Sequence, residues 1–140
     1  EAKRDARHQR RLRYMKKVLA NIRGVVVRGA GRGKHLGIPT MNINMQTPPE
    51  LDHGIYVCRI CVGDVWRTGV MHFGPVLMFE PQNITCEVHV FDFNEDVVGA
   101  DVEVEAISFI RPIKKFDTVE ALIDAIENDC RVARLYFHGK

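Results

Sequence analysis

A glycine-rich basic loop and the short polar strand after it hold the residues of this chain best suited to chemistry. Residues 24–42 read GVVVRGAGRGKHLGIPTMN and contain five of the eleven glycines. Glycines let backbone N–H groups approach an anion, because no Cβ stands in the way. The loop is therefore a candidate phosphate-binding segment, and a flexible turn between two strands is the competing interpretation. Its candidate ligands are Gly29, Gly31, Gly33, Lys34 and Gly37.

Thr40 and Asn42 are the most specific candidates in this stretch. Residues 39–45 alternate between polar and apolar side chains, which predicts a strand with both of them on one face, about 7 Å apart. A hydroxyl and an amide oxygen so placed can bind a hard cation or a phosphate-bound water. The alternative is the exposed polar face of an edge strand.

Glu87 is the candidate general base. It lies in the middle of the predicted strand ITCEVHVF, between apolar neighbours, and His89 shares its face. A carboxylate in such a place can acquire a pKa suited to proton transfer. A surface ladder of Glu and His on a two-sided sheet would give the same spacing.

The rest of the pattern predicts a mainly β protein with two helices. Residues 5–22 have a helical apolar period and Gly24 would close that helix, while Asp117 and Glu120 form a capping box for a C-terminal helix. Short strands with frequent turn signals indicate a sandwich or barrel. A Rossmann fold is excluded because strands and helices do not alternate. We expect the strands over 25–27, 39–45, 55–62, 65–73, 84–93 and 101–109.

Composition indicates one ordinary globular domain. The chain has 140 residues, 46% hydrophobic and 27% charged, with no apolar run that would span a membrane and no secretory signal. The four cysteines include a single CxxC, Cys58 to Cys61, inside a predicted strand, where residues three apart face opposite sides. We therefore expect reduced, mostly buried cysteines in a cytoplasmic protein.

Charge is distributed unevenly along the chain. Residues 1–23 carry nine Lys and Arg against two acidic residues, whereas residues 24–140 carry eleven against sixteen. A basic arm on an acidic domain can contact nucleic acid, but the same pattern is typical of a solvated helix face or a connector. We expect residues 1–23 to form a basic helical extension or linker, and residues 24–140 to form the domain.

Four segments, in order, resemble the riboflavin kinase family. The family signature is a glycine loop of the form G-x-G-[RK]-x-L-G followed by Pro-Thr-Ala-Asn, and here residues 31–37 read GRGKHLG and residues 39–42 read PTMN. The other three matches are HGIY at 53–56, EVHVFDF at 87–93 with DVVG at 96–99, and FIRPIKKFD at 109–117, to which Asp129 adds an acid within the C-terminal helix.

The resemblance implies a six-stranded antiparallel Greek-key barrel with a C-terminal helix. It implies transfer of the γ-phosphoryl group of ATP to the 5′-hydroxyl of riboflavin, giving FMN. Thr40 and Asn42 would hold Mg²⁺ and the phosphates, the loop glycines and Lys34 would cover the nucleotide, and Glu87 would be the base. Arg111 and Asp129 would lie on the flavin side. An FMN adenylyltransferase domain or partner would accompany the kinase, as is common in bacteria.

One segment departs from the family pattern. Where the family usually shows Asn-Ile-Gly-x-[RK]-Pro-Thr-Phe, this chain has His72 in place of Asn and Val76-Leu77-Met78 in place of the Arg-Pro-Thr portion. The loss of a cation and a hydroxyl leaves open a barrel that binds flavin or nucleotide without turnover. A nucleic-acid-binding barrel is a third alternative, but the acidic barrel with few aromatic residues disfavours it.

Overall fold

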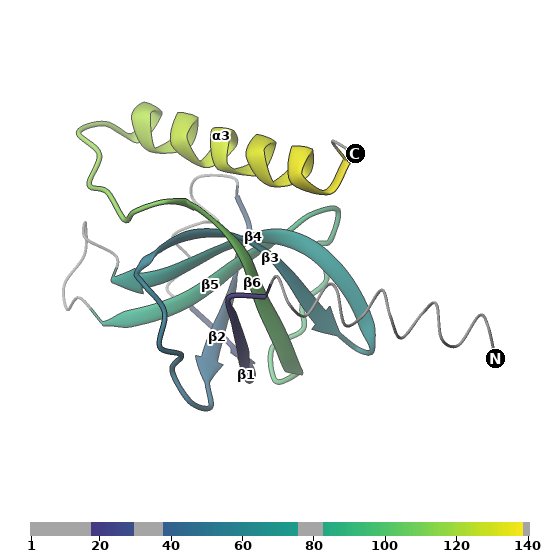
Figure 1. The fold of residues 1–140 in the computed structure, drawn as a ribbon. Coiled ribbons are helices and arrows are strands. Elements are labelled where there is room, and N and C mark those ends of the chain that lie inside the picture. Colours follow the sequence, from purple (N-terminus) through teal and green to yellow (C-terminus); the bar gives the residue numbers. More distant parts are fainter. Residues whose placement is uncertain (1–17, 30–37, 76–82, 139–140) are drawn as a thin grey trace.

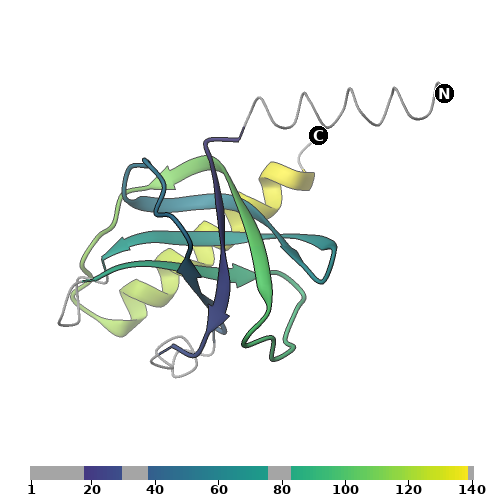
Figure 2. The same ribbon diagram turned by 90° about the horizontal axis from the view of Figure 1, so that it is seen from below.

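The chain folds into a closed barrel of six antiparallel strands with one helix against its outside (Figures 1 and 2). The computed structural model describes residues 18–29, 38–75 and 83–138. The predicted mainly β barrel with a C-terminal helix is confirmed. Its elements are β1 (Ala20–Val27), β2 (Met41–Met45), β3 (Gly54–Val62), β4 (Val65–Pro75), β5 (Ile84–Val90), β6 (Asp101–Arg111) and α3 (Val119–His138).

The strand order around the barrel is β1-β2-β5-β4-β3-β6, and β6 closes it by pairing with β1. β2 therefore lies beside β5, and β3 lies beside β6. The connections from β2 to β3 and from β5 to β6 pass between strands that are not neighbours, which is the kind of crossing that a Greek-key barrel contains.

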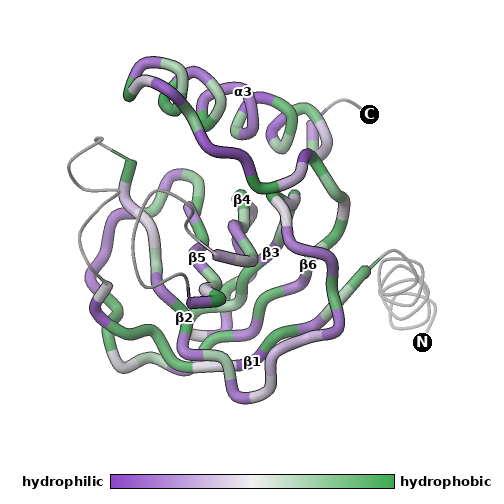
Figure 3. Tube along the Cα trace, turned by 90° about the vertical axis from the view of Figure 1, so that its left-hand side faces the viewer, coloured by the Kyte–Doolittle hydropathy of each residue, from purple (hydrophilic) through white to green (hydrophobic). Residues whose placement is uncertain are grey.

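Alternating apolar side chains fill the barrel interior. Along β6, Val102, Val104 and Ala106 are buried, as their period of two predicts. Figure 3 shows hydrophobic and hydrophilic positions interspersed along the strands, and β5, with the sequence ITCEVHV, alternates between buried and half-buried positions over Cys86–Val90. All four cysteines are free, as expected, and Cys58 and Cys86 belong to this core. Among the described residues, no helix is both long and apolar enough to cross a membrane.

The N-terminal prediction is wrong where the structure can test it. The helix predicted over residues 5–22 was to end at Gly24, but β1 already begins at Ala20 and continues through Gly24. The earlier part of that helix lies outside the described residues. Gly24 does not cap a helix: a Cβ on it would lie 2.2 Å from the Asn44 carbonyl oxygen of β2, so close strand contact requires glycine there. The predicted start of the domain at residue 24 therefore falls inside a strand.

The helix α3 covers a second apolar cluster on the outer surface of the barrel. Ala133 of α3 packs against buried residues of β3 and β4 and the residue just after β5, namely Ile55, Val57, Val70 and Phe91. The N-cap is Thr118 and not the predicted Asp117, because the Thr118 hydroxyl accepts a hydrogen bond from the Ala121 N–H at 3.0 Å. The position of the helix along the sequence is otherwise as predicted.

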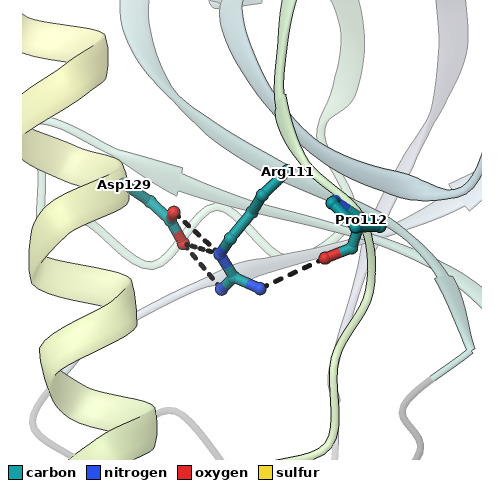
Figure 4. A network of polar contacts seen from close by, with 3 residues as sticks. All are labelled: Arg111, Pro112 and Asp129. Atoms are coloured by element: carbon teal, nitrogen blue, oxygen red, sulfur yellow. Dashed lines mark hydrogen bonds and ion pairs between the residues drawn. The ribbon is translucent and has the colours of Figure 1, made fainter.

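A buried ion pair fixes α3 to the end of β6 (Figure 4). Arg111 Nε and one of its terminal nitrogens donate to the Asp129 carboxylate at 2.9 and 2.8 Å. The Asp129 side chain is 2% exposed and the Arg111 side chain 22%. Burial raises the pKa of Asp129 above its ordinary value of 3.8, and the neighbouring Arg111 opposes that rise. The guanidinium is therefore what allows a carboxylate to stay ionised at this position.

Removing only the cation should destabilise the fold. We expect Arg111→Met to lower the free energy of unfolding by about 3 kcal/mol at neutral pH, because Asp129 would remain as a buried carboxylate without its partner. Without Arg111, burial would raise the folded-state pKa of Asp129 further, and Asp129 would favour the fold only when protonated. The loss of stability should therefore shrink as the pH falls toward 3.8, the ordinary pKa of this carboxyl group. Urea unfolding across this pH range measures the effect.

The double variant Arg111→Met with Asp129→Leu is the matched control. It removes both charges and should recover most of the stability at neutral pH. Equal losses in the single and the double variant would show that the ion pair does not hold the helix in place.

Candidate functional site

Five outward-facing residues form one row across the barrel. The strand register pairs Asn42 with Glu87, Glu87 with His72, His72 with Ile55, and Ile55 with Arg111. Opposed residues of antiparallel strands point to the same face, with Cβ atoms about 5 Å apart. The sequence neighbours of Asn42 and Glu87 fill the core, so the row itself lies on the outer surface. The structure thus places two candidates from distant parts of the sequence side by side.

Thr40 lies immediately before β2 at the Asn42 end of this row, and it is exposed. Met41 and Ile43 are buried, which confirms the predicted faces of the strand. The His89 ring is 2.7 Å from the Pro39 carbonyl oxygen through Nδ1. Because a carbonyl only accepts, Nδ1 carries the proton, and His89 ties the segment before β2 to β5. Sequence reasoning placed His89 beside Glu87 but missed this role.

Gly29 lies directly against the Asn42 side chain. A Cβ on Gly29 would stand 1.9 Å from Asn42 Nδ2 and 2.4 Å from its Cγ. The glycine therefore allows the chain after β1 to approach the amide. The other loop candidates, Gly31, Gly33, Lys34 and Gly37, lie outside the described residues, and their predicted role in nucleotide binding stays a prediction.

Arg111 and Asp129, the two flavin-side candidates, are engaged with each other. Both Asp129 oxygens accept hydrogen bonds from Arg111. Arg111 also lies 5.4 Å from the Phe116 ring centre, so its orientation is fixed from two sides. The carboxylate can therefore act on a ligand only by holding Arg111 in place, whereas Arg111 retains some exposure.

A groove runs along α3 beside the outer face of β5. It has a volume of about 530 Å³ and a mainly apolar inner surface. Apolar and charged side chains of α3 together form one wall, with His89 and Ile38 opposite. Cys130 and Arg134 contribute to the wall on α3. The groove adjoins the row at β5, two residues along the strand from Glu87. A flat apolar ring is the kind of group that such a lining can hold.

The donors at the Asn42 end of the row fit a magnesium ion. A Thr hydroxyl and an Asn amide are hard oxygen ligands, and Mg²⁺ usually takes only one or two protein ligands and keeps waters and substrate phosphates for the rest. Thr40 is exposed and Asn42 is half-buried, so neither oxygen is enclosed by the core. Elsewhere in the described ranges there is no cluster of His, Cys, Asp and Glu that could hold a metal.

These features fit a β-barrel phosphotransferase: an oxygen pair for a metal and phosphate, a neighbouring carboxylate, and an apolar groove. The chain matches the riboflavin kinase (flavokinase) family over residues 17–137, and it belongs to that family.

Known proteins of this family are similar over most of the chain. Human riboflavin kinase is 38% identical over 80% of this chain and 77% of its own length. The bifunctional riboflavin kinase/FMN adenylyltransferase of Bacillus subtilis is 33% identical over 83% of this chain. A Streptococcus pneumoniae crystal structure titled as a macrolide-efflux protein aligns with a TM-score of 0.74 and 32% identity, over 81% of this chain and 38% of that one. The chain spans 18% and 38% of the lengths of two bacterial relatives that it matches.

Replacing Gly29 by alanine tests the contact with Asn42. The new methyl would displace the Asn42 amide, which lies at the end of a movable side chain, and the backbone at Gly29 is not in the left-handed region. We therefore expect little loss of thermal stability but a fall in kcat/KM for MgATP of about tenfold or more, because a small misplacement is costly in phosphoryl transfer. Steady-state kinetics at saturating riboflavin measures this fall.

A double-mutant cycle supplies the control. If Gly29→Ala acts through the amide, it should add almost nothing in an Asn42→Ala background. Full additivity of the two losses would contradict the proposed contact.

Proposed function

We propose that this chain transfers the γ-phosphoryl group of ATP to the 5′-hydroxyl of riboflavin, giving FMN and ADP. The observation that carries this proposal is the pairing of Asn42 with Glu87 across β2 and β5. It puts Asn42, a candidate ligand for nucleotide and metal, and Glu87, a candidate base, on one face of the sheet, with their Cβ atoms about 5 Å apart. Phosphoryl transfer requires mainly that donor and acceptor be positioned together while charge is neutralised. The pairing supports the positioning, and the neutralising charge would come from Mg²⁺.

Thr40 and Asn42 would hold Mg²⁺ through their side-chain oxygens. The ion neutralises phosphate charge when bound. His89 supports this end of the site because it ties Pro39 to β5, and Gly29 supports it because it leaves room for the Asn42 amide. The loop glycines 31, 33 and 37, with Lys34, would cover the nucleotide.

Glu87 would act as the general base. The 5′-oxygen of riboflavin forms a bond to the γ-phosphorus while the bond from that phosphorus to the bridging oxygen of ADP breaks. The hydroxyl proton passes to the Glu87 carboxylate. Because strands on both sides fix Glu87 in register, little motion is needed to align it with the acceptor.

The flavin ring would lie toward α3. The groove beside His89 offers an apolar wall, and Arg111, held by Asp129, offers a cation at the far end of the row. The altered residues 76–78 lie outside the described ranges. A barrel that binds flavin without turnover is therefore the alternative that the kinetic experiment below must exclude.

We also propose that an adenylyltransferase acts on the FMN product, either as a further domain or as a separate partner. The support is the Bacillus subtilis relative, whose name joins the two activities. The basic residues that precede β1 would be an extension or connector, since their charge differs in sign from that of the barrel.

Glu87→Gln tests the function and the base together. We expect FMN formation to fall by a factor of about 100 to 10,000, because the amide cannot accept the proton. Glu103→Gln on β6 is the control, and it should retain wild-type turnover. Chromatographic measurement of FMN from riboflavin, ATP and Mg²⁺ decides. Wild-type rates in Glu87→Gln would refute the base, and absence of FMN with the wild-type chain would favour the binding-only barrel.

A further inference from the structure

His89 contacts both parts of the site, which the proposed function assigns to different substrates. Its Nδ1 donates to the Pro39 carbonyl oxygen at 2.7 Å, and Pro39 is directly followed by Thr40, a candidate metal ligand. Its ring also lines the groove along α3, where the flavin ring would lie. One half-buried side chain therefore reaches from the nucleotide end of the site to the flavin end.

The hydrogen bond to Pro39 matters because Thr40 lies just before the paired part of its strand. In the described part of the chain, the pairing of β2 begins at Met41 with β5 and at Asn42 with β1. Thr40 precedes both positions and is exposed. The position of its hydroxyl therefore depends on the backbone just before it, which His89 holds.

His89 is also connected to α3 through Phe91. The two rings pack edge to face, with their centres 5.7 Å apart. The guanidinium carbon of Arg134 on α3 lies 4.1 Å from the Phe91 ring centre, and one of its nitrogens lies 3.7 Å from an Asp92 carboxylate oxygen. Contacts thus run without a gap from α3 through Phe91 and His89 to the backbone before Thr40.

The spacing along β5 allows one riboflavin molecule to meet Glu87 and His89 together. Both side chains face outward and lie two residues apart, which is about 7 Å along the strand. The ribityl chain joins the reacting hydroxyl of riboflavin to its ring system through about six bonds, an extended length of about 7 Å. With the hydroxyl at Glu87, the ring system therefore reaches the groove beside His89.

We infer that His89 is a positioning residue that couples the binding of riboflavin to that of MgATP. The inference rests on the proposed function, because that function supplies both ligands. A flavin in the groove restricts the His89 ring to the orientation that bonds to Pro39, and that bond holds Thr40 ready for metal and phosphate. A side chain ordered by one ligand costs less to order for the other, and the gain in affinity is the same in both directions.

Two substitutions each keep one of the two contacts. His89→Phe keeps an aromatic ring beside the groove but removes the donor to Pro39, whereas His89→Asn keeps a donor near the position of Nδ1 but removes the ring. Riboflavin affinity, measured by quenching of flavin fluorescence, should rise about fivefold or more in the wild type when MgADP is added. The rise should be lost in both variants. MgADP is used because it has no γ-phosphoryl group to transfer.

The separate affinities distinguish lost coupling from a general loss of structure. We expect His89→Phe to bind riboflavin alone as the wild type does but MgADP alone about two- to tenfold more weakly, the usual effect of one neutral hydrogen bond. His89→Asn should show the opposite pattern. Thr85→Val is the matched control, because the Thr85 hydroxyl donates to the Gly74 carbonyl at 3.1 Å at the other end of β5. Its loss should leave the coupling unchanged.

Wild-type coupling in either His89 variant, or no effect of MgADP on the wild type, would overturn the inference. Loss of coupling in Thr85→Val would also do so, since the effect would then not depend on Pro39. If the wild type shows the predicted coupling but forms no FMN, the kinase proposal fails while the assignment of His89 stands. Melting temperatures of the three variants within a few degrees of the wild type exclude unfolding as the cause.

Discussion

The register between β2, β5 and β4 is the constraint on which the site depends. Asn42, Glu87 and His72 face outward together because each is paired with the next across two hydrogen-bonded strand pairs. Side chains alternate along a strand, so a slip of one residue would turn Glu87 into the core and Val88 to the surface. The apolar residues inside the barrel therefore fix the polar residues outside it, and the core and the site cannot vary independently.

The outer surface of the barrel is divided between packing and chemistry. Ile55, Val57, Val70 and Phe91 face outward yet are buried, because α3 covers them. The row with Glu87 and His72 lies beside this cluster, and the Arg111–Asp129 ion pair holds the helix where the row ends. One helix thus completes the second core and supplies one wall of the groove that lies near Glu87.

Local pattern in the sequence was sufficient to locate the strands after β1 and to assign the faces of β2 and β5, because alternation directly reports which side is buried. The strands predicted over 55–62 and 65–73 leave only Gly63 and Asp64 between them, and both residues have the positive φ of a tight hairpin turn. The start of β1 at Ala20 was not predictable, since Ala20–Arg23 continue a helical apolar period in the sequence and only the pairing with β6 makes them a strand. Thr118 and Asp117 are both good caps, and sequence alone does not rank them.

Contacts between residues far apart in the sequence determine features of the site that the sequence alone did not predict. Arg111 and Asp129 look like two ligand candidates in the sequence, but their separation hides the fact that they bind each other. Gly29 looks like one of several loop glycines, and only the structure shows that it makes room for Asn42. A residue can therefore be required by the site without touching a substrate. Such a residue acts by fixing the position of another candidate, as Gly29 does for Asn42 and Asp129 does for Arg111.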